Sequence, residues 1–405
     1  MRVAAVVQRY GTSVAGGAER LAREVCTRLA LRDDVTVLTT TARDYVTWRN
    51  EFEPGEEVLD GVRIRRFPVA RERSAESFRL ASQALFASRP TLAAELDWVR
   101  LQGPDTPALY REMWRTLGDF EAVLFFTYLY APTVHGLAIA PGHAVLVPLA
   151  HNEAPLYLRT FKNLLRLPRQ LVYQTPEEQA LVERVVPRNP VPSQVVGYGV
   201  DLPRLDAPVP WPTSVDPGTR YLLYLGRLDP SKGIPELLER FTAYRRRGSR
   251  LELVLAGEAA MELPEIEGVR RTGFVSEEER DRLLAHARIV VQPSLFESLS
   301  IVALEAWARA RPVLAQRGSD VLAAQINRSH GGFLYGSGEE FDRVLELAEG
   351  DAPELAEHGR SGQDFVRATC SWEQVTAGYR RALEEAASPP VPRSESPTAP
   401  DARGN

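Results

Sequence analysis

The sequence predicts an α/β protein with two doubly wound domains that face each other across a cleft. Short β-branched apolar runs alternate with longer amphipathic ones, which is typical of parallel sheets covered by helices on both faces. A proline-rich stretch at 190–217 interrupts this alternation, which then restarts. A chain of 405 residues, 44% of them hydrophobic, is long enough for two separate cores.

The first domain is predicted at 1–200 and the second at 219–371, with a proline-rich linker at 201–218 between them. The apolar runs expected as strands of the first domain are 2–7, 35–40, 62–67, 122–126, 144–149 and 171–174. Those expected in the second domain are 221–226, 251–257, 288–293 and 312–316.

The end of the chain divides into two parts. Residues 372–387 have a helical pattern, and we expect this helix to return to the first domain. Residues 388–405 have no apolar pattern and are rich in proline and serine, which predicts a disordered tail.

Composition and charge exclude several classes of protein. A formal net charge of −5 argues against a general nucleic-acid binder, which needs a broad basic excess. The two cysteines, Cys26 and Cys370, match no metal-site spacing and indicate a reducing compartment. No stretch reaches the roughly 18 uncharged apolar residues of a membrane span, and the N-terminal apolar run is too short for a signal peptide. We therefore expect a cytoplasmic protein.

The loop "GRLDPSKG" at 226–233 follows the first strand of the second domain. In open parallel sheets, ligands bind beyond the carboxyl ends of the strands, where helix N-termini point. Gly226 lets a ligand approach the backbone, and Arg227 and Lys232 supply two cations next to a helix start. These features suit a diphosphate, although an ordinary surface loop with solvated charges would contain the same residues.

The segment "FESLSIVALEAW" at 296–307 places two glutamates eight positions apart. Glu297 is expected in a loop before a helix that starts near 298–300, whereas Glu305 lies one to two turns inside that helix. In a continuous helix such positions are separated by roughly 12 Å along the axis and about 80° around it, so they would hold the two ends of an elongated ligand. Alternatively, Glu297 interacts only with the helix dipole and Glu305 lies on a partly exposed face.

Two features of the first domain follow its predicted strands. Gly16 and Gly17, in "AGGAER", precede a helix and leave room for a ligand against the backbone, although paired glycines are often merely a turn. His151 comes directly after the apolar run at 144–149, at the carboxyl end of a strand. A lone histidine is more often structural, but this position favours a site.

Taken together, "GGAER", "GRLDPSKG" and "FESLSIVALEAWARARPVLA" resemble the retaining GT-B glycosyltransferases of family 4, the glycosyl transferases group 1, over nearly the whole chain. The resemblance implies two Rossmann-like domains, the first receiving an acceptor and the second binding a nucleotide-diphosphate sugar. It implies that Arg227 and Lys232 bind the diphosphate. It also implies that Glu297 contacts hydroxyls of the transferred sugar and that Glu305 binds the ribose.

The resemblance extends to the neighbouring positions. His151 would face the sugar and act in catalysis with Arg227, Lys232 and Glu297. The remaining donor-binding positions that it implies are Gly16, Gly17, Gly226, Ser298, Leu299 and Ser300. Ser300 stands where the family most often has glycine, and its hydroxyl would cap the helix or bond a phosphate.

The sequence contains no Asp-x-Asp pair of the kind that binds a divalent ion on a diphosphate. We therefore expect a metal-independent enzyme without a cofactor, in which side-chain cations, helix N-termini and Gly17 stabilise the leaving diphosphate. The resemblance implies retention of the anomeric configuration. The acceptor hydroxyl would attack from the side on which the diphosphate leaves, and a phosphate oxygen would take its proton.

Acceptor binding is predicted from one loop and membrane contact from one basic segment. Tyr45, Trp48 and Arg49 fall in a long loop at 39–57, where aromatic faces would stack on sugars, although a surface loop is equally compatible. Residues 156–171 alternate basic and apolar side chains. This pattern suits peripheral contact with an anionic membrane, or a helix that faces the core with a solvated basic side.

Three function classes remain open from the sequence. The first is a sugar transferase in cell-surface polysaccharide or glycoconjugate biosynthesis, acting on a saccharide, lipid-linked or other acceptor. The second is another enzyme of the same fold, such as a nucleotide-sugar epimerase or a phosphorylase, and the third is a catalytically silent nucleotide-sugar-binding module. Residues 258–261 and 272–279 are expected to line the pocket for the base.

Overall fold

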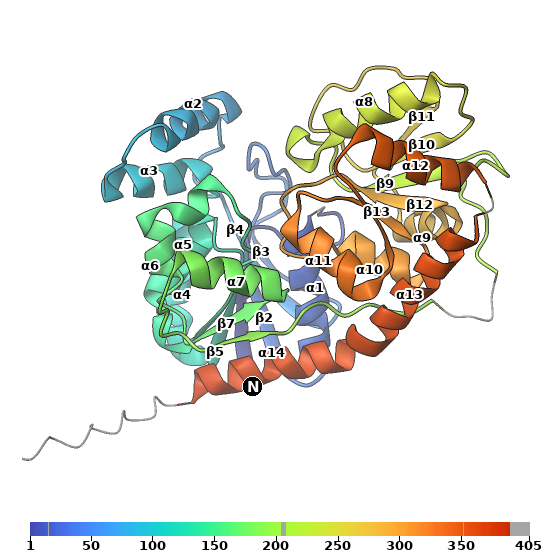
Figure 1. Cartoon of the computed structure of the whole chain (residues 1–405). Helices are drawn as coiled ribbons and strands as arrows, with labels where there is room; N and C mark the ends of the chain where they lie inside the picture. Colours follow the sequence, from blue (N-terminus) through green and yellow to red (C-terminus); the bar gives the residue numbers. More distant parts are fainter. Residues whose placement is uncertain (15, 204–207, 351, 389–405) are drawn as a thin grey trace, which may run out of the picture.

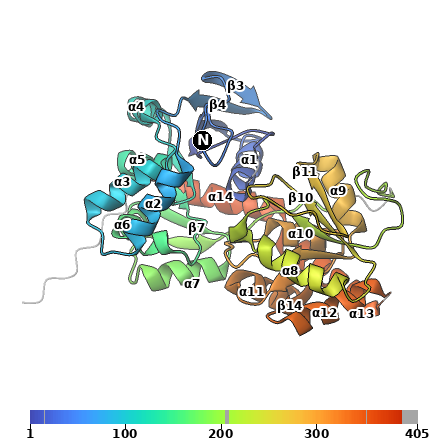
Figure 2. The ribbon, with the colours of Figure 1, turned by 90° about the horizontal axis from the view of Figure 1, so that it is seen from above.

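The computed structural model describes residues 1–14, 16–203, 208–350 and 352–388. Two α/β domains lie side by side in both views, the first in blue and green and the second in yellow and orange (Figures 1 and 2). The tail predicted to be disordered lies, except for residue 388, outside the described residues, as do residues 204–207 of the predicted linker.

The sheet of the first domain has the strand order β3-β4-β2-β1-β5-β6-β7-β8. Its strands run parallel except for β3, which pairs antiparallel with β4 at the edge. The strands are β1 (Arg2–Val6), β2 (Asp34–Thr40), β3 (Gly55–Leu59), β4 (Val62–Phe67), β5 (Ala122–Phe126), β6 (Ala144–Val147), β7 (Gln170–Tyr173) and β8 (Ser193–Val195).

Helices cover both faces of this sheet because its central strands are apolar on both sides. Along β1, Val3 and Ala5 enter one buried cluster, whereas Ala4 and Val6 enter another on the opposite face. The helices are α1 (Gly17–Leu29), α2 (Ala75–Phe86), α3 (Leu92–Gln102), α4 (Pro107–Thr116), α5 (Ala131–Ile139), α6 (Arg159–Leu164) and α7 (Pro176–Val185). Short 3-10 turns occur at η1 (Leu117–Asp119), η2 (Pro141–His143) and η3 (Ala154–Tyr157).

The second domain contains a parallel sheet in the order β11-β10-β9-β12-β13-β14. Its strands are β9 (Tyr221–Leu225), β10 (Glu252–Ala256), β11 (Val269–Gly273), β12 (Ile289–Gln292), β13 (Val313–Gln316) and β14 (Gly332–Tyr335). Its helical segments are η4 (Pro230–Lys232), α8 (Ile234–Arg245), α9 (Glu277–His286), α10 (Ile301–Ala308), α11 (Asp320–Ser329), α12 (Gly338–Glu349) and α13 (Pro353–Thr369).

The last helix, α14 (Trp372–Ala387), leaves the second domain and runs beneath the first (Figure 1). It packs against α1 and the strands β5, β6 and β7. Its buried side chains, among them Val375 and Tyr379, belong to one hydrophobic cluster that continues through both domains. The two domains are therefore joined by shared packing as well as by the linker.

The predicted fold class is confirmed, and each predicted strand corresponds to an observed one. The proline-rich stretch at 190–217 was expected to be a linker without a regular helix, and no strand was predicted in it, but Ser193–Val195 form β8. Proline is tolerated beside this three-residue edge strand because the strand has a neighbour on one side only. The strands β3, β11 and β14 were also missed.

The basic segment at 156–171 does not form the long amphipathic helix that membrane contact would need. The structure has η3, the six-residue α6, and then β7 from Gln170. The apolar side chains Leu156, Phe161 and Leu165 are completely buried in the first domain, so they cannot enter a bilayer. Within the described residues, no helix is long and apolar enough to cross a membrane.

Candidate active site

The loop that follows β9 brings a guanidinium and an ammonium to the edge of the second domain. Arg227 Nε donates to Asp229 Oδ2 at 3.1 Å, and Asp229 Oδ1 accepts the N–H of Ser231 at 2.8 Å, which caps η4. Lys232 is the last residue of η4. At Gly226 the backbone has a φ of 144°, which favours glycine. Asp229 therefore positions both cations, a role that the sequence analysis missed.

Glu297 lies in the loop between β12 and α10 and pairs with the ammonium. Lys232 Nζ donates to Glu297 Oε1 at 2.9 Å, and both side chains are partly exposed. Ser300 is the N-cap of α10, since its Oγ accepts the N–H of Ala303 at 3.2 Å. Because Ser300 Oγ also donates to Gln292 Oε1, this hydroxyl is used in capping rather than directed at a ligand.

Ser298 and Leu299, the other predicted donor-binding residues of this loop, differ in exposure. Ser298 is buried, while Leu299 is partly exposed and packs against the large hydrophobic cluster. The helix begins at Ile301, so Glu297 lies four residues before it and Glu305 four residues after this first position. The two glutamates are therefore not on one continuous helix.

His151 approaches from the first domain, after β6. Its Nδ1 lies 3.8 Å from Glu153 Oε1. Burial lowers the pKa of His151, and the positive charge of Lys232 lowers it further. The negative charges of Glu153 and Glu297 act in the opposite direction. Lys232 and Glu297 belong to the other domain, so the imidazole is within electrostatic reach of their ion pair. The lowered pKa favours neutral imidazole near neutral pH.

Tyr45 contacts the second domain directly. The guanidinium of Arg227 lies over its ring, with Cζ 4.3 Å from the ring centroid. The expectation that Trp48 also offers a face to an acceptor is wrong. Trp48 is completely buried and its Nε1 donates to the Gln102 carbonyl at 2.7 Å, so its ring packs inside the loop. Arg49 is exposed.

The two glycines before α1 have different surroundings. Gly16 has a φ of 151°, and a Cβ at this position would collide with the Glu19 carboxylate. Glu19 is buried and pairs with Arg9 at 2.7 Å. Position 16 thus requires glycine because a side chain there would displace Glu19 from its ion pair with Arg9. Gly17 is the first residue of α1, and the space where its side chain would stand is open.

Glu305 is held between arginines of both domains. Its Oε1 lies 2.6 Å from Arg20 Nη2, on α1 of the first domain, and 2.7 Å from Arg280 Nη1, on α9 of the second. Arg280 Nη2 also contacts the second carboxylate oxygen. Only 6% of Glu305 is exposed. The sequence analysis expected a ligand diol to satisfy this carboxylate, whereas here two guanidinium groups do so.

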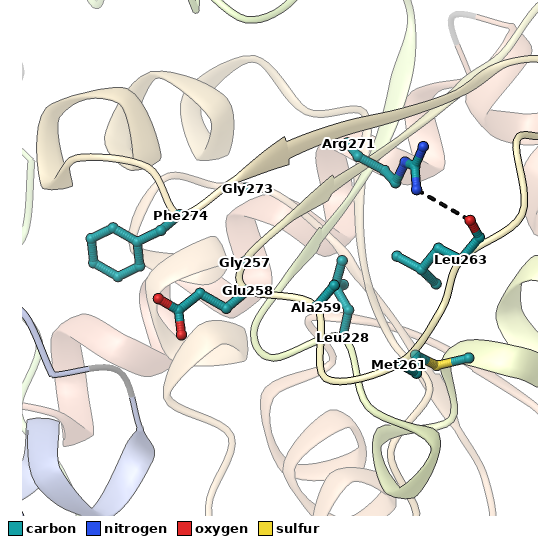
Figure 3. A pocket seen from close by; sticks show the side chains of 9 residues that line it. All are labelled: Leu228, Gly257, Glu258, Ala259, Met261, Leu263, Arg271, Gly273 and Phe274. Carbon is teal, nitrogen blue, oxygen red and sulfur yellow. Dashed lines mark hydrogen bonds between the residues drawn. The ribbon is translucent and has the colours of Figure 1, made fainter. Parts of the chain in front are cut away.

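A cavity of about 530 Å³ lies between the loops that follow β10 and β11 (Figure 3). Both segments expected to line a base pocket contribute to it. Its lining residues are Leu228, Gly257, Glu258, Ala259, Met261, Leu263, Arg271, Gly273 and Phe274. Phe274 is 57% exposed and lies beside Glu258 at one end, while Arg271 donates to the Leu263 carbonyl at the other.

The structure brings most of the predicted site residues to the boundary between the domains. Tyr45 contacts Arg227 across this boundary, and His151 lies within electrostatic range of the Lys232–Glu297 pair. Among the residues that the structure describes, no group of three or more His, Cys, Asp or Glu side chains is arranged to hold a metal ion.

Residues 219–349 match the family model described as glycosyl transferases group 1. The chain is 30% identical over 221 residues to a phosphatidyl-myo-inositol mannosyltransferase of Propionibacterium freudenreichii, a match that covers 52% of this chain and 55% of the relative. It is 29% identical over 275 residues to a D-inositol 3-phosphate glycosyltransferase of Mycolicibacterium gilvum, covering 62% and 61%. The chain thus spans little more than half the length of these curated relatives.

Among solved structures, the chain is similar to Anabaena HepE in complex with UDP and glucose. The superposition has a TM-score of 0.68 at 15% identity, and it covers 95% of this chain and 99% of the other. At this level of identity the likeness shows the fold alone, which is GT-B.

Proposed function

We propose that this chain, whose second domain belongs to the glycosyl transferases group 1 and whose two domains have the GT-B fold, is a retaining glycosyltransferase. It transfers a sugar from a nucleotide-diphosphate sugar to an acceptor hydroxyl. The observation that carries the proposal is that Arg227 and the Lys232–Glu297 pair of the second domain face Tyr45 and His151 of the first, with Arg227 in contact with the Tyr45 ring.

The second domain binds the nucleotide part of the donor. The cavity behind β10 and β11 receives the base, and exposed Phe274 offers it an aromatic face. That HepE was solved with UDP and glucose supports a donor of this kind for a chain of the same fold. Glu305 binds the ribose once Arg20 moves away from it, since the carboxylate is otherwise covered.

The diphosphate lies between Arg227 and Lys232. The planar guanidinium suits bidentate binding of phosphate oxygens, and the ammonium of Lys232 supplies a compact charge. As the bond from the sugar to the diphosphate breaks, negative charge grows on the leaving oxygen, and these preorganised cations stabilise it. We propose that this stabilisation proceeds without a metal ion, and that Glu297 exchanges its bond with Lys232 for a hydroxyl of the sugar.

Retention of configuration requires the acceptor hydroxyl to attack from the face on which the diphosphate leaves. Its proton passes to a phosphate oxygen, so no carboxylate nucleophile is needed on the opposite face. His151, with its lowered pKa, stays neutral and donates or accepts a hydrogen bond at the transferred sugar. Tyr45, over Arg227, lies where an acceptor would enter from the first domain.

The acceptor is a hydroxyl of a saccharide, a lipid-linked sugar or another polar molecule. Relatives named as acting on phosphatidyl-myo-inositol and on D-inositol 3-phosphate support an acceptor from cell-envelope or related small-molecule metabolism. We accordingly place the protein in the biosynthesis of a cell-surface polysaccharide or glycoconjugate, on the cytoplasmic side.

The proposal is tested by incubating the purified protein with UDP- and GDP-sugars and measuring slow release of the free nucleotide. One donor is expected to be hydrolysed, with and without EDTA, and the Lys232→Ala variant should lose this activity. Release that EDTA abolishes would overturn metal independence. No release from any donor, together with no binding of UDP or GDP by calorimetry, would overturn the function itself.

A further inference from the structure

Glu178, in the first turn of α7, is a buried carboxylate that the proposed reaction does not use. It is 1% exposed, and among the described residues no basic side chain pairs with it. Its Oε1 accepts the N–H of Ala150 at 2.7 Å, and its Oε2 accepts the N–H of Gln174 at 2.7 Å. Burial raises the pKa of Glu178 to about 8, while the N–H groups of Gln174, Ala150 and Leu149 oppose this shift.

One of these hydrogen bonds holds Ala150, the residue directly before His151. Leu149 has a φ of 52°, a left-handed conformation that a branched side chain rarely adopts. This turn directs the N–H groups of Leu149 and Ala150 toward the Glu178 carboxylate, and the chain then delivers His151 to the domain boundary. Glu178 therefore stabilises the bend on which the position of the imidazole depends.

Helix capping alone does not account for Glu178. In "TPEE" (175–178), a threonine followed three residues later by glutamate is a capping-box sequence, and such a glutamate accepts an N–H at the helix start. The bond from the N–H of Gln174, one residue before the N-cap Thr175, serves the same helix start. The bond from Ala150 does not, because it spans 28 residues to another loop, and a capping glutamate gains nothing from being fully buried.

The same helical turn also contacts the opposite wall of the site. Thr175 is the N-cap of α7, and its Oγ1 accepts the N–H of Glu178 at 3.1 Å. That hydroxyl donates to the carbonyl of Ser298 at 3.0 Å, in the second domain. Ser298 follows Glu297, which pairs with Lys232. One turn of helix thus touches the backbone beside His151 and the backbone beside Glu297.

We propose that Glu178 is a positioning residue for His151, and that the first turn of α7 aligns this imidazole with the Lys232–Glu297 pair across the domain boundary. The structural part of the proposal stands on the hydrogen bonds of Glu178 and Thr175. Its consequence for turnover rests on the proposed function.

The first test observes His151 directly, without any activity assay. The imidazole signals of the six histidines are recorded by NMR over a pH titration, and the His151 signal is assigned with His151→Gln. In Glu178→Gln, one N–H loses its acceptor, so the His151 signal is expected to move and its pKa to rise toward the ordinary value as the ring gains water. The other five signals should stay in place.

Glu183→Gln is the matched control, because Glu183 is an exposed residue of the same helix. It is expected to leave the His151 signal unchanged. An unmoved His151 signal in a folded Glu178→Gln protein would overturn the positioning role, as would equal shifts of all the histidine signals. Glu178→Gln preserves the shape of the side chain, so the test does not depend on whether Glu178→Ala folds.

The second test uses the donor that the wild-type protein hydrolyses. Relative to wild type, kcat is expected to fall about tenfold in Glu178→Gln and about a hundredfold in Glu178→Ala, since small displacements of a reacting group have effects of this size. KM for the donor should stay unchanged because Arg227 and Lys232 are untouched. A rise in KM equal to the fall in kcat would indicate a general structural defect and overturn the proposal.

The cross-domain link is probed with Thr175. Thr175→Ser keeps the hydroxyl and is expected to retain turnover, whereas Thr175→Val, of the same shape, removes the bond to Ser298 and should lower kcat about tenfold. Equal turnover in the two variants would overturn the alignment across the boundary. If wild-type protein hydrolyses no donor, the proposed function fails, while the NMR titration still decides the role of Glu178.

Discussion

The two glutamates of the "FESLSIVALEAW" segment have opposite surroundings. Glu297 lies in a partly exposed loop with a single lysine partner from its own domain. Glu305 is buried on α10 between two arginines, one of which belongs to the other domain. A ligand can replace the lysine at Glu297 by small side-chain movements. At Glu305 a ligand must displace Arg20, and this displacement breaks a contact between the domains.

This difference suggests how donor binding and domain arrangement are linked. If the ribose competes with Arg20 for Glu305, then occupying the nucleotide site removes one contact between the domains, whereas the ion pair of Glu297 with Lys232 lies within the second domain. Other contacts between the domains remain. Arg328 of α11 pairs with Glu177 of α7 at 3.1 Å, and Thr175 still reaches Ser298.

Stability should separate the two carboxylates most strongly. Replacing Glu305 with Gln removes the buried partner of Arg20 and Arg280 and leaves them only the exposed Glu277, at 3.6 and 3.9 Å, so we expect a loss of about 3–5 kcal/mol in the free energy of unfolding. The same change at Glu297 breaks a partly exposed pair and should cost less than about 1 kcal/mol. Urea unfolding of both variants measures the difference. Similar losses would show that burial does not distinguish the two sites.

Lys232 should affect turnover more than stability. Lys232→Ala removes one stabilising cation of the leaving diphosphate, so donor turnover is expected to fall about 100- to 1,000-fold. The sequence has one other lysine, Lys162, whose Nζ lies near the Tyr157 ring; it belongs to α6, on the side of the first domain away from the second (Figures 1 and 2). Lys162→Ala is therefore the matched control and should keep wild-type turnover. Comparable losses in both variants would contradict the assignment.

Arg20 tests the competition itself. In Arg20→Ala, Glu305 retains Arg280, so the protein should fold, and the ribose no longer has to displace a guanidinium. Affinity for UDP or GDP, measured by calorimetry, is expected to increase about fivefold. Arg328→Ala breaks another tie between the domains, away from the nucleotide, and should leave affinity unchanged. Weaker binding in Arg20→Ala would mean that Arg20 supports the donor site instead.

The sequence was sufficient to predict the fold and the loops that carry the site. Alternating strands and helices, together with the ends of parallel strands, place Arg227, Lys232, Glu297 and His151 near one another before any coordinates are known. Short edge strands such as β8 were missed because three residues give no periodic pattern.

Contacts between distant residues could not be predicted in this way. Trp48 was assigned to acceptor binding because aromatic faces in a long loop can stack on sugars, and only the tertiary structure shows that its ring is buried with its Nε1 bonded to the Gln102 carbonyl. Arg20 and Glu178 carry no local signal at all, since their partners lie 285 and 28 residues away in the chain.

The smallest effect concerns the pH dependence of His151. Because burial lowers its pKa, the imidazole stays neutral to a lower pH than an exposed histidine, and protonation on acidification should reduce kcat/KM only below about pH 6.5. The Glu153 carboxylate, 3.8 Å from the His151 ring, raises the pKa of His151. In Glu153→Gln the pH below which kcat/KM falls should therefore be lower still, by less than about one pH unit. The control His143→Gln, directly before β6, should leave this pH unchanged. If kcat/KM instead began to fall at a higher pH in Glu153→Gln, a group other than His151 would be the one that titrates.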